Sequence, residues 1–162
     1  MPDRGAHEID RIRAEYAARM RDLPPDFYAS NRPENQFFHA GTARICARLM
    51  SRNGVFPLNN AHILDVGCGS GQWLLEFLRW GATAHRIHGI DLLPDRISQA
   101  RDRLAAAELV TGDARTLPWK DASFDVVSQF TLFSSILDSE VKQQIAKEML
   151  RVLKPGGHIL WY

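Results

Sequence analysis

Three glycines at alternate positions, Gly67, Gly69 and Gly71, separate the apolar residues 63–66 from a helix-like segment that begins at Gln72. Glycine adopts positive φ readily and allows a ligand to approach the main chain. A strand that ends in glycines and opens a helix also presents backbone N–H groups and the positive end of a helix dipole. This pattern predicts a binding site for an anionic or polar ligand.

The residues after the last glycine discriminate among ligands. A phosphate-binding P-loop has Lys followed by Ser or Thr at this point, whereas Gln72 and Trp73 follow Gly71. The dinucleotide fingerprint GxGxxG requires a third glycine where Gln72 stands. An NAD-dependent oxidoreductase therefore remains only as an alternative hypothesis, and the lack of a Tyr-xxx-Lys pair also counts against it.

Acidic residues stand at the ends of successive apolar segments. Asp65 lies two positions before Gly67, and Asp91 lies 20 residues after Gly71. An acidic side chain at the second of these places can accept hydrogen bonds from both hydroxyls of a ribose. Helix capping and turn formation are the alternative roles for such residues.

The elements that must position these residues follow from the hydrophobic pattern. From His62 onward, short apolar segments alternate with helical segments, which is typical of βαβ units and a parallel sheet. We expect strands at residues 63–66, 87–91, 109–111, 124–129 and 158–161, and helices at residues 72–80, 94–107 and 138–153. The glycines and the aspartates then belong to the carboxyl edge of the sheet.

The N-terminal part is expected to add helices to this core. Within one structural domain, residues 1–61 form a helical cap and residues 62–162 form the core. A charged helix over residues 7–23 carries an apolar stripe that needs a surface to cover, made of Ile9, Ile12, Tyr16 and Met20. A second helix runs from Phe37 to about Arg52, with an apolar side made of Phe38, Ile45 and Leu49.

Five motifs together resemble the class I S-adenosylmethionine-dependent methyltransferases. LDVGCGSG resembles the first motif of this family, with Asp65 as the acidic residue before GxGxG. HGIDLLP, TGDARTLPW, FDVVSQFTLFSSI and LRVLKPGGHILWY follow in the family's order. The nearest likeness is to the small-molecule type 11 branch. The resemblance implies an α/β fold with a Rossmann-like, doubly wound, mostly parallel sheet, and S-adenosylmethionine as cofactor.

The resemblance also implies roles for particular residues around the methionine and ribose of the cofactor. The loop of Gly67, Cys68, Gly69 and Gly71 would lie beneath the methionine portion. A carboxylate or main-chain carbonyls near Asp65 would meet the methionine amino group. The two ribose hydroxyls would be bound by Asp91.

Further residues would contact the adenine and the sulfonium. Asp113 would accept from the adenine amine, and Ala114 would offer a backbone N–H. Leu92 would flank the adenine or ribose, with core packing as its alternative role. Gln129 and Phe130 follow the fourth strand at the methyl end, where the ring of Phe130 would attract the sulfonium or simply belong to the core.

No catalytic residue is assigned, because methyl transfer from an activated sulfonium requires alignment and exclusion of water rather than a fixed catalytic group. His39 is a candidate base, but a surface or packing role is favoured for it. Cys68 is interpreted as a small filler, and Trp73 and Trp80 as core residues. Asp125 is assigned to structure, because it opens its strand at the end remote from the glycines.

Composition narrows the possible partners and location. Twenty Lys and Arg against 19 Asp and Glu produce no strong field, so we expect neither a nucleic acid nor an anionic membrane as partner. Given the resemblance, a small-molecule methyl acceptor is the default, since no basic stripe, NPPY-like motif or set of metal ligands indicates another class. Two cysteines without a CxxC pair fit a reducing cytoplasm, and no His spacing predicts a metal site. No apolar segment reaches the roughly 20 residues of a membrane helix.

One departure from the family concerns the end of the chain. The family's sheet usually has seven strands, whereas this sequence ends at HILWY, in the expected fifth strand. We expect either a fragment of a longer protein or a strand edge covered by a partner or a second copy. The alternative function is therefore a non-catalytic nucleotide-binding or interaction protein derived from a truncated methyltransferase.

Overall fold

A parallel five-stranded sheet in the order β3-β2-β1-β4-β5 forms the centre of the protein. The structure, a computed structural model, describes residues 4–24, 26–27, 29 and 31–162. The strands are β1 Ile63–Val66, β2 Ile87–Asp91, β3 Glu108–Thr111, β4 Phe124–Gln129 and β5 Leu153–Trp161. The predicted α/β class with a doubly wound parallel sheet is confirmed, and no sixth or seventh strand occurs among the described residues.

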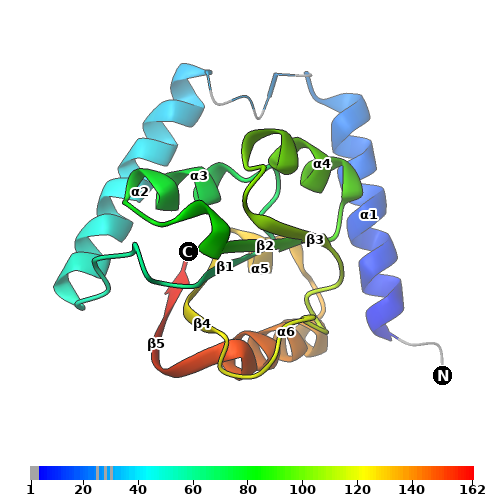
Figure 1. The fold of residues 1–162 in the computed structure, drawn as a ribbon. Helices are drawn as coiled ribbons and strands as arrows, with labels where there is room; N and C mark the ends of the chain where they lie inside the picture. Colours follow the sequence, from blue (N-terminus) through cyan, green and yellow to red (C-terminus); the bar gives the residue numbers. More distant parts are fainter. Residues whose placement is uncertain (1–3, 25, 28, 30) are drawn as a thin grey trace.

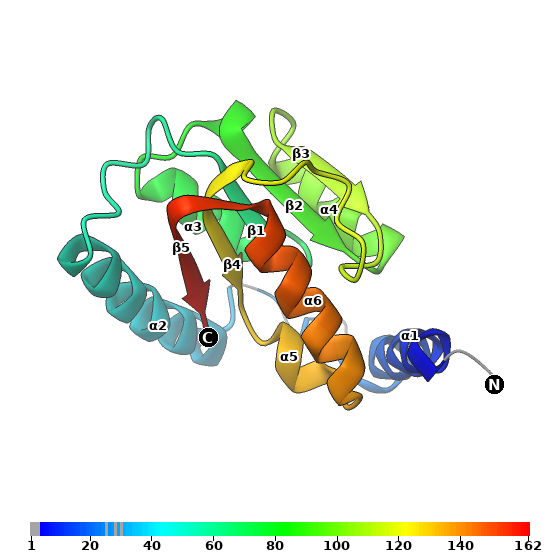
Figure 2. The same ribbon diagram turned by 90° about the horizontal axis from the view of Figure 1, so that it is seen from below.

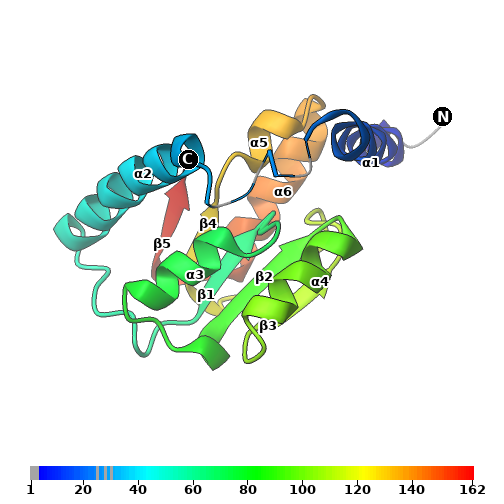
Figure 3. The ribbon, with the colours of Figure 1, turned by 90° about the horizontal axis from the view of Figure 1, so that it is seen from above.

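Helices cover both faces of this sheet (Figures 1 and 3). They are α1 Arg4–Asp22, α2 Pro33–Arg52, α3 Gln72–Arg79, α4 Pro94–Arg103, α5 Leu132–Ser135 and α6 Ser139–Val152, with a 3-10 turn at Ala84–Arg86. One core cluster joins α2, α3 and α4 to the sheet, and a second joins α1 and α6 to its other face. Figure 2 shows α6 along that second face, with α1 beside it.

The strands are apolar because both of their faces are covered. In β1, Ile63 belongs to the first core cluster, whereas Leu64 and Val66 belong to the second. Strands of a parallel sheet with helices on both faces read as continuous apolar segments for this reason. The edge at which β1 and β2 end is thereby held between two packed layers.

The predicted apolar side of the second helix is wrong. Phe38, Ile45 and Leu49 are 60%, 62% and 48% exposed. The side of α2 that packs inward is instead made of Thr42, Ala43, Cys46 and Met50. These residues also recur at helical spacing, so two different sides of the helix fit the same period.

Several element boundaries also differ from expectation. α2 begins at Pro33 rather than Phe37, since proline suits the first turn of a helix. α4 ends at Arg103, because Leu104 leaves the helical conformation with φ −134° and ψ 52°. β5 begins at Leu153, and an irregular register between Phe124 and Val126 accommodates this early start.

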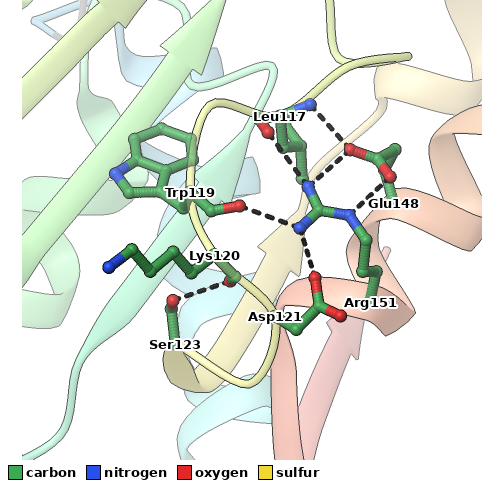
Figure 4. Close-up of polar contacts among 7 residues, drawn as sticks. All are labelled: Leu117, Trp119, Lys120, Asp121, Ser123, Glu148 and Arg151. Carbon is green, nitrogen blue, oxygen red and sulfur yellow. Dashed lines mark hydrogen bonds and ion pairs between the residues drawn. The ribbon is translucent and has the colours of Figure 1, made fainter.

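The loop between β3 and β4 is fastened to α6 by Arg151 and Glu148 (Figure 4). The Arg151 guanidinium donates to the main-chain oxygens of Leu117 and Trp119 and to the carboxylate of Asp121, at 2.8–3.0 Å. Glu148 accepts from the Leu117 N–H at 2.8 Å and from Arg151. The segment that follows Asp113 is thereby held against the second face of the sheet.

Two broader features are clear from the described part of the chain. None of its helices combines the length and apolar character needed to cross a membrane. The side chains of Cys46 and Cys68 are both free thiols in the core.

Candidate functional site

The glycine loop lies directly against the end of β2. The N–H groups of Gly67 and Cys68 both donate to the main-chain oxygen of Ile90, at 2.8 and 3.0 Å. Gly67, Gly69 and Gly71 all have positive φ, at 75°, 54° and 83°. This backbone conformation explains why glycine occupies all three positions.

Packing adds a second reason at two of these positions. A Cβ on Gly67 would lie 2.9 Å from Leu132 Cδ1, and one on Gly71 would lie 2.8 Å from Leu104 Cδ1. The chain's own side chains therefore fill the space beside Gly67 and Gly71. At Gly69 the nearest atom would be Arg96 Nη1 at 3.3 Å.

Asp91 connects the glycine loop to the start of α4. Its Oδ2 accepts from the Gly69 N–H at 2.8 Å, and its Oδ1 accepts from the Leu93 N–H at 2.9 Å. A carboxylate oxygen has more than one lone pair, so each can accept another hydrogen bond. Asp91 therefore combines a fixed position with remaining capacity for a ligand.

A cavity of about 120 Å³ opens in front of this edge. It brings together six of the residues predicted from the sequence: Gly67, Asp91, Leu92, Asp113, Ala114 and Phe130. Five other predicted residues lie outside its lining: Asp65, Cys68, Gly69, Gly71 and Gln129. The ends of β1, β2, β3 and β4 thus meet at one site.

Helix α1 supplies a wall of this cavity that the sequence did not link to the site. Ile9, Ile12 and Tyr16 line it, and the Arg96 guanidinium lies 4.9 Å from the centre of the Tyr16 ring. A cation at this distance over an aromatic face is attracted to it. The helical spacing of Ile9, Ile12 and Tyr16 was a visible signal, but nothing in the sequence indicated which surface they cover.

Glu8 fastens α1 to the segment between α5 and α6. Its Oε1 accepts from the Leu137 N–H at 2.6 Å, and its two oxygens each accept from Arg11 at 2.8 Å. Arg11 also donates to the Ser135 main-chain oxygen at 2.7 Å. The hydrogen bonds from Arg11 lower the pKa of Glu8 from 4.5 to about 2.

Asp113 already has a partner in its own loop. Its Oδ1 accepts from the Arg115 N–H at 2.9 Å, and its Oδ2 accepts from Arg115 Nε at 2.8 Å. Arg115 Nη2 lies 2.7 Å from the same Oδ2. Any ligand that approaches Asp113 thus meets a carboxylate paired with an arginine.

Asp65 and Cys68 are buried beneath the loop. Asp65 is 1% exposed, and its Oδ1 accepts from Ser128 Oγ at 2.8 Å. Burial raises the pKa of Asp65 to about 7, and the nearby charge of Asp91 acts in the same direction. Burial also raises the pKa of the Cys68 thiol, so this side chain is unreactive and fits its interpretation as a filler.

Gln129 and Phe130 end β4 with different surroundings. The buried Gln129 amide donates to the Tyr162 main-chain oxygen at 3.0 Å and accepts from the Leu132 N–H at 3.1 Å, so its polar atoms cross-link the backbone. The Phe130 ring lines the cavity and stacks on Trp73 at 3.6 Å with an angle of 7°. Trp73 and Trp80 both pack against the first core cluster, as predicted.

His39 and Asp125 lie away from this cavity. The His39 ring packs on Trp73 at 4.5 Å, and its Nε2 lies 3.4 Å from Glu76 Oε2, in keeping with the favoured packing role. Asp125 accepts from the His62 N–H and pairs with Lys154, both at 2.8 Å, which agrees with a structural role. No group of three or more His, Cys, Asp or Glu in the described part of the chain is arranged to hold a metal ion.

A family model for the methyltransferase domain matches residues 63–157, which is more than half of the chain. The chain belongs to the methyltransferase domain family. Its topology and its ordered motifs place this methyltransferase domain in the S-adenosylmethionine-dependent class I, with S-adenosylmethionine as cofactor.

Individual relatives of this methyltransferase domain differ in their acceptors. A malonyl-(acyl-carrier protein) O-methyltransferase from Erwinia pyrifoliae is 34% identical over 125 residues, which are 76% of this chain and 44% of that protein. A demethylmenaquinone methyltransferase from Staphylococcus aureus is 36% identical over 116 residues, or 70% of this chain and 46% of that protein. The chain thus spans a little under half the length of these curated relatives.

A solved structure extends the similarity over almost the whole chain. The PH0226 protein from Pyrococcus horikoshii aligns with a TM-score of 0.70 and 26% identity, covering 91% of this chain and 64% of that one. At this coverage the shared fold includes most of the N-terminal segment as well as the core.

The residues around the cavity suit the chemistry of this cofactor. Asp91 can accept from hydroxyls, and the Phe130 ring, which stacks on Trp73, borders the cavity as an aromatic group that would attract a sulfonium. The size of the cavity does not suit it, because ligand pockets usually measure about 300–1,000 Å³ and this one measures about 120 Å³ with α1 packed across it. We therefore expect α1 to shift outward when the cofactor binds.

Proposed function

We propose that this chain transfers the methyl group of S-adenosylmethionine to a small-molecule acceptor. The observation that carries the proposal is the position of Asp91, which is held by the glycine loop at the end of β2 and faces a cavity that Phe130 shares. The carboxylate of Asp91 suits the hydroxyls of a ribose, and the ring of Phe130 suits a sulfonium. Both residues lie at the same edge of the sheet.

In this proposal each predicted residue keeps a role. The main chain of Gly67, Cys68, Gly69 and Gly71 lies beneath the methionine portion. Because Asp65 is buried, main-chain oxygens near it, rather than its carboxylate, meet the methionine amino group. Leu92, Asp113 and Ala114 contact the adenine, which requires Arg115 to share the carboxylate of Asp113. Gln129 holds the end of β4 in place for Phe130.

The chemistry asked of the protein is mainly positional. When bound, the cofactor supplies an already activated methyl group. The chain's residues hold the ribose and align the sulfonium, and α1 excludes water from the cavity. No general base is assigned, because the need for one depends on the acceptor atom. The two named relatives act on very different acceptors, so similarity supports a small molecule without selecting one.

We also propose where the chain acts and how its parts cooperate. Residues 1–61 form a cap whose helix α1 covers the cofactor pocket of the core at residues 62–162. Free cysteines suit the cytoplasm. The outer edge of β5, where Trp161 is 54% exposed, suits a partner or a second copy of the chain.

A non-catalytic binding protein is the second candidate function. The observation behind it is the small cavity, about 120 Å³ with α1 packed across it, because a pocket that opens rarely turns over slowly. This candidate shares the cofactor site with the first and differs in methyl transfer alone.

Calorimetric titration with S-adenosylhomocysteine tests the shared cofactor site, with NAD as the control ligand. The homocysteine compound needs no acceptor, and we expect it to bind at micromolar concentration while NAD does not bind. Preferential binding of NAD would favour an oxidoreductase. Binding of neither ligand by the folded chain would contradict the proposal.

A further inference from the structure

A second and larger cleft lies on the other side of the glycine loop. Its volume is about 950 Å³, within the range usual for ligand sites. It runs between the start of α2, the start of α3 and the end of α4, which contribute Gln36, His39, Gln72 and Arg103 among others. In Figures 1 and 3, α2 and α3 lie side by side at this place.

The charges in this cleft are of one sign. Arg79 and Arg103 line it, and the described residues of its lining include no carboxylate. Arg103 forms no ion pair with any residue that the structure describes. The amide side chains of Gln36 and Gln72 add hydrogen-bond donors.

Glu76 holds one of the arginines in position. Its Oε2 accepts from Arg79 Nη1 at 2.8 Å and lies 3.4 Å from His39 Nε2. Glu76 stands behind the lining and neutralises part of the charge of Arg79, so Arg103 leaves the cleft with a net positive charge. Arginines on two different helices suit a ligand with more than one anionic group.

We propose that this cleft binds a small molecule that carries carboxylate or phosphate groups. The site is separate from the cofactor pocket, since the two cavities have no lining residue in common. Trp73 contacts a ring from each lining: the His39 ring of this cleft is tilted on it at 4.5 Å, and the Phe130 ring of the cofactor pocket is stacked on it at 3.6 Å. The proposal does not depend on methyl transfer.

The test is calorimetric titration of the full chain with citrate and, in a separate arm, with inorganic pyrophosphate. The stronger of the two probes identifies the preferred anionic group. We expect saturable binding that Arg103→Gln and Arg79→Gln each weaken about tenfold or more, because each removes a charge-assisted hydrogen bond. The matched control is Arg48→Gln, an exposed arginine of α2 outside the cleft, which changes the net charge equally.

Titration of the same variants with S-adenosylhomocysteine separates this site from the cofactor pocket. We expect its affinity to stay within about twofold of the wild type, since neither arginine lines that pocket. The absence of saturable anion binding by the wild type, or equal weakening by Arg48→Gln, would overturn the proposal. Loss of both ligands in Arg103→Gln would also overturn it, because the arginine would then serve the cofactor pocket.

Discussion

Asp91 organises its surroundings before any ligand arrives. Its two oxygens hold the N–H groups of Gly69 and Leu93, so the carboxylate cannot rotate away from the cavity. In Asp91→Asn one oxygen is replaced by an NH₂ group that cannot accept, and we expect the affinity for S-adenosylhomocysteine to fall about tenfold or more. Calorimetry measures the affinity. Asp95→Asn, an exposed carboxylate in the first turn of α4, is the control, and equal affinities in all three proteins would remove Asp91 from the site.

Asp65 makes stability depend on pH near neutrality. Its pKa is raised from 3.8 to about 7 in the folded chain, so between these values the unfolded chain is ionised and the folded chain is protonated. The contribution of protonated Asp65 to the free energy of unfolding is complete below pH 3.8 and is lost as pH rises to about 7. Over this range the free energy of unfolding falls by at most about 1.4 kcal/mol per pH unit. We expect Asp65→Asn to flatten this slope in urea unfolding between pH 5 and pH 7. A slope identical to that of the wild type would show that Asp65 ionises freely when folded.

At the scale of elements, the docking of α1 depends on one buried carboxylate. Glu8 joins the helix to Leu137 and also pairs with Arg11 of the same helix. The Arg11 hydrogen bonds are the main cause of its low pKa of about 2, so the contribution of ionised Glu8 to stability is present above pH 4.5 and lost as pH falls toward 2. We expect Glu8→Gln to speed amide exchange throughout α1 at pH 7 by about tenfold. Glu15→Gln is the control, because Glu15 pairs with Arg19 on the same helix and leaves the docking contacts intact. Equal exchange in both variants would mean that apolar contacts alone hold α1.

The predictions for α1 and α2 show which structural features can be predicted from the sequence and which cannot. The stripe of Ile9, Ile12 and Tyr16 was readable because helical spacing is local, but its partner surface depends on residues more than a hundred positions away. In α2 two sides of the helix carry apolar residues at helical spacing. The larger side chains, including Ile45, led to the prediction of the side that is in fact exposed. The strands and the aspartates at strand ends were accessible because each follows from a repeated local pattern. The pairing of Asp113 with Arg115 was not, since it depends on how one loop folds back.

For the whole molecule, the size of the cofactor pocket and the docking of α1 belong to the same equilibrium between a closed and an open state. The cavity is small for a nucleoside ligand while α1 is in place, so we expect the binding-competent state to be one in which α1 has moved outward. Apparent affinity is reduced by the fraction of molecules that are open. Glu8 favours the closed state through Leu137.

Weakening this docking contact is therefore expected to speed ligand entry. In stopped-flow measurements of tryptophan fluorescence, Glu8→Gln should bind S-adenosylhomocysteine with an association rate constant about threefold to tenfold above that of the wild type, because more molecules are open. Trp73 is a suitable reporter, since it stacks on Phe130 at the cavity wall. Glu15→Gln should associate at the wild-type rate. If all three proteins associated equally fast, the ligand would enter without displacing α1, and the small cavity would have to widen through the loops at the ends of the strands instead.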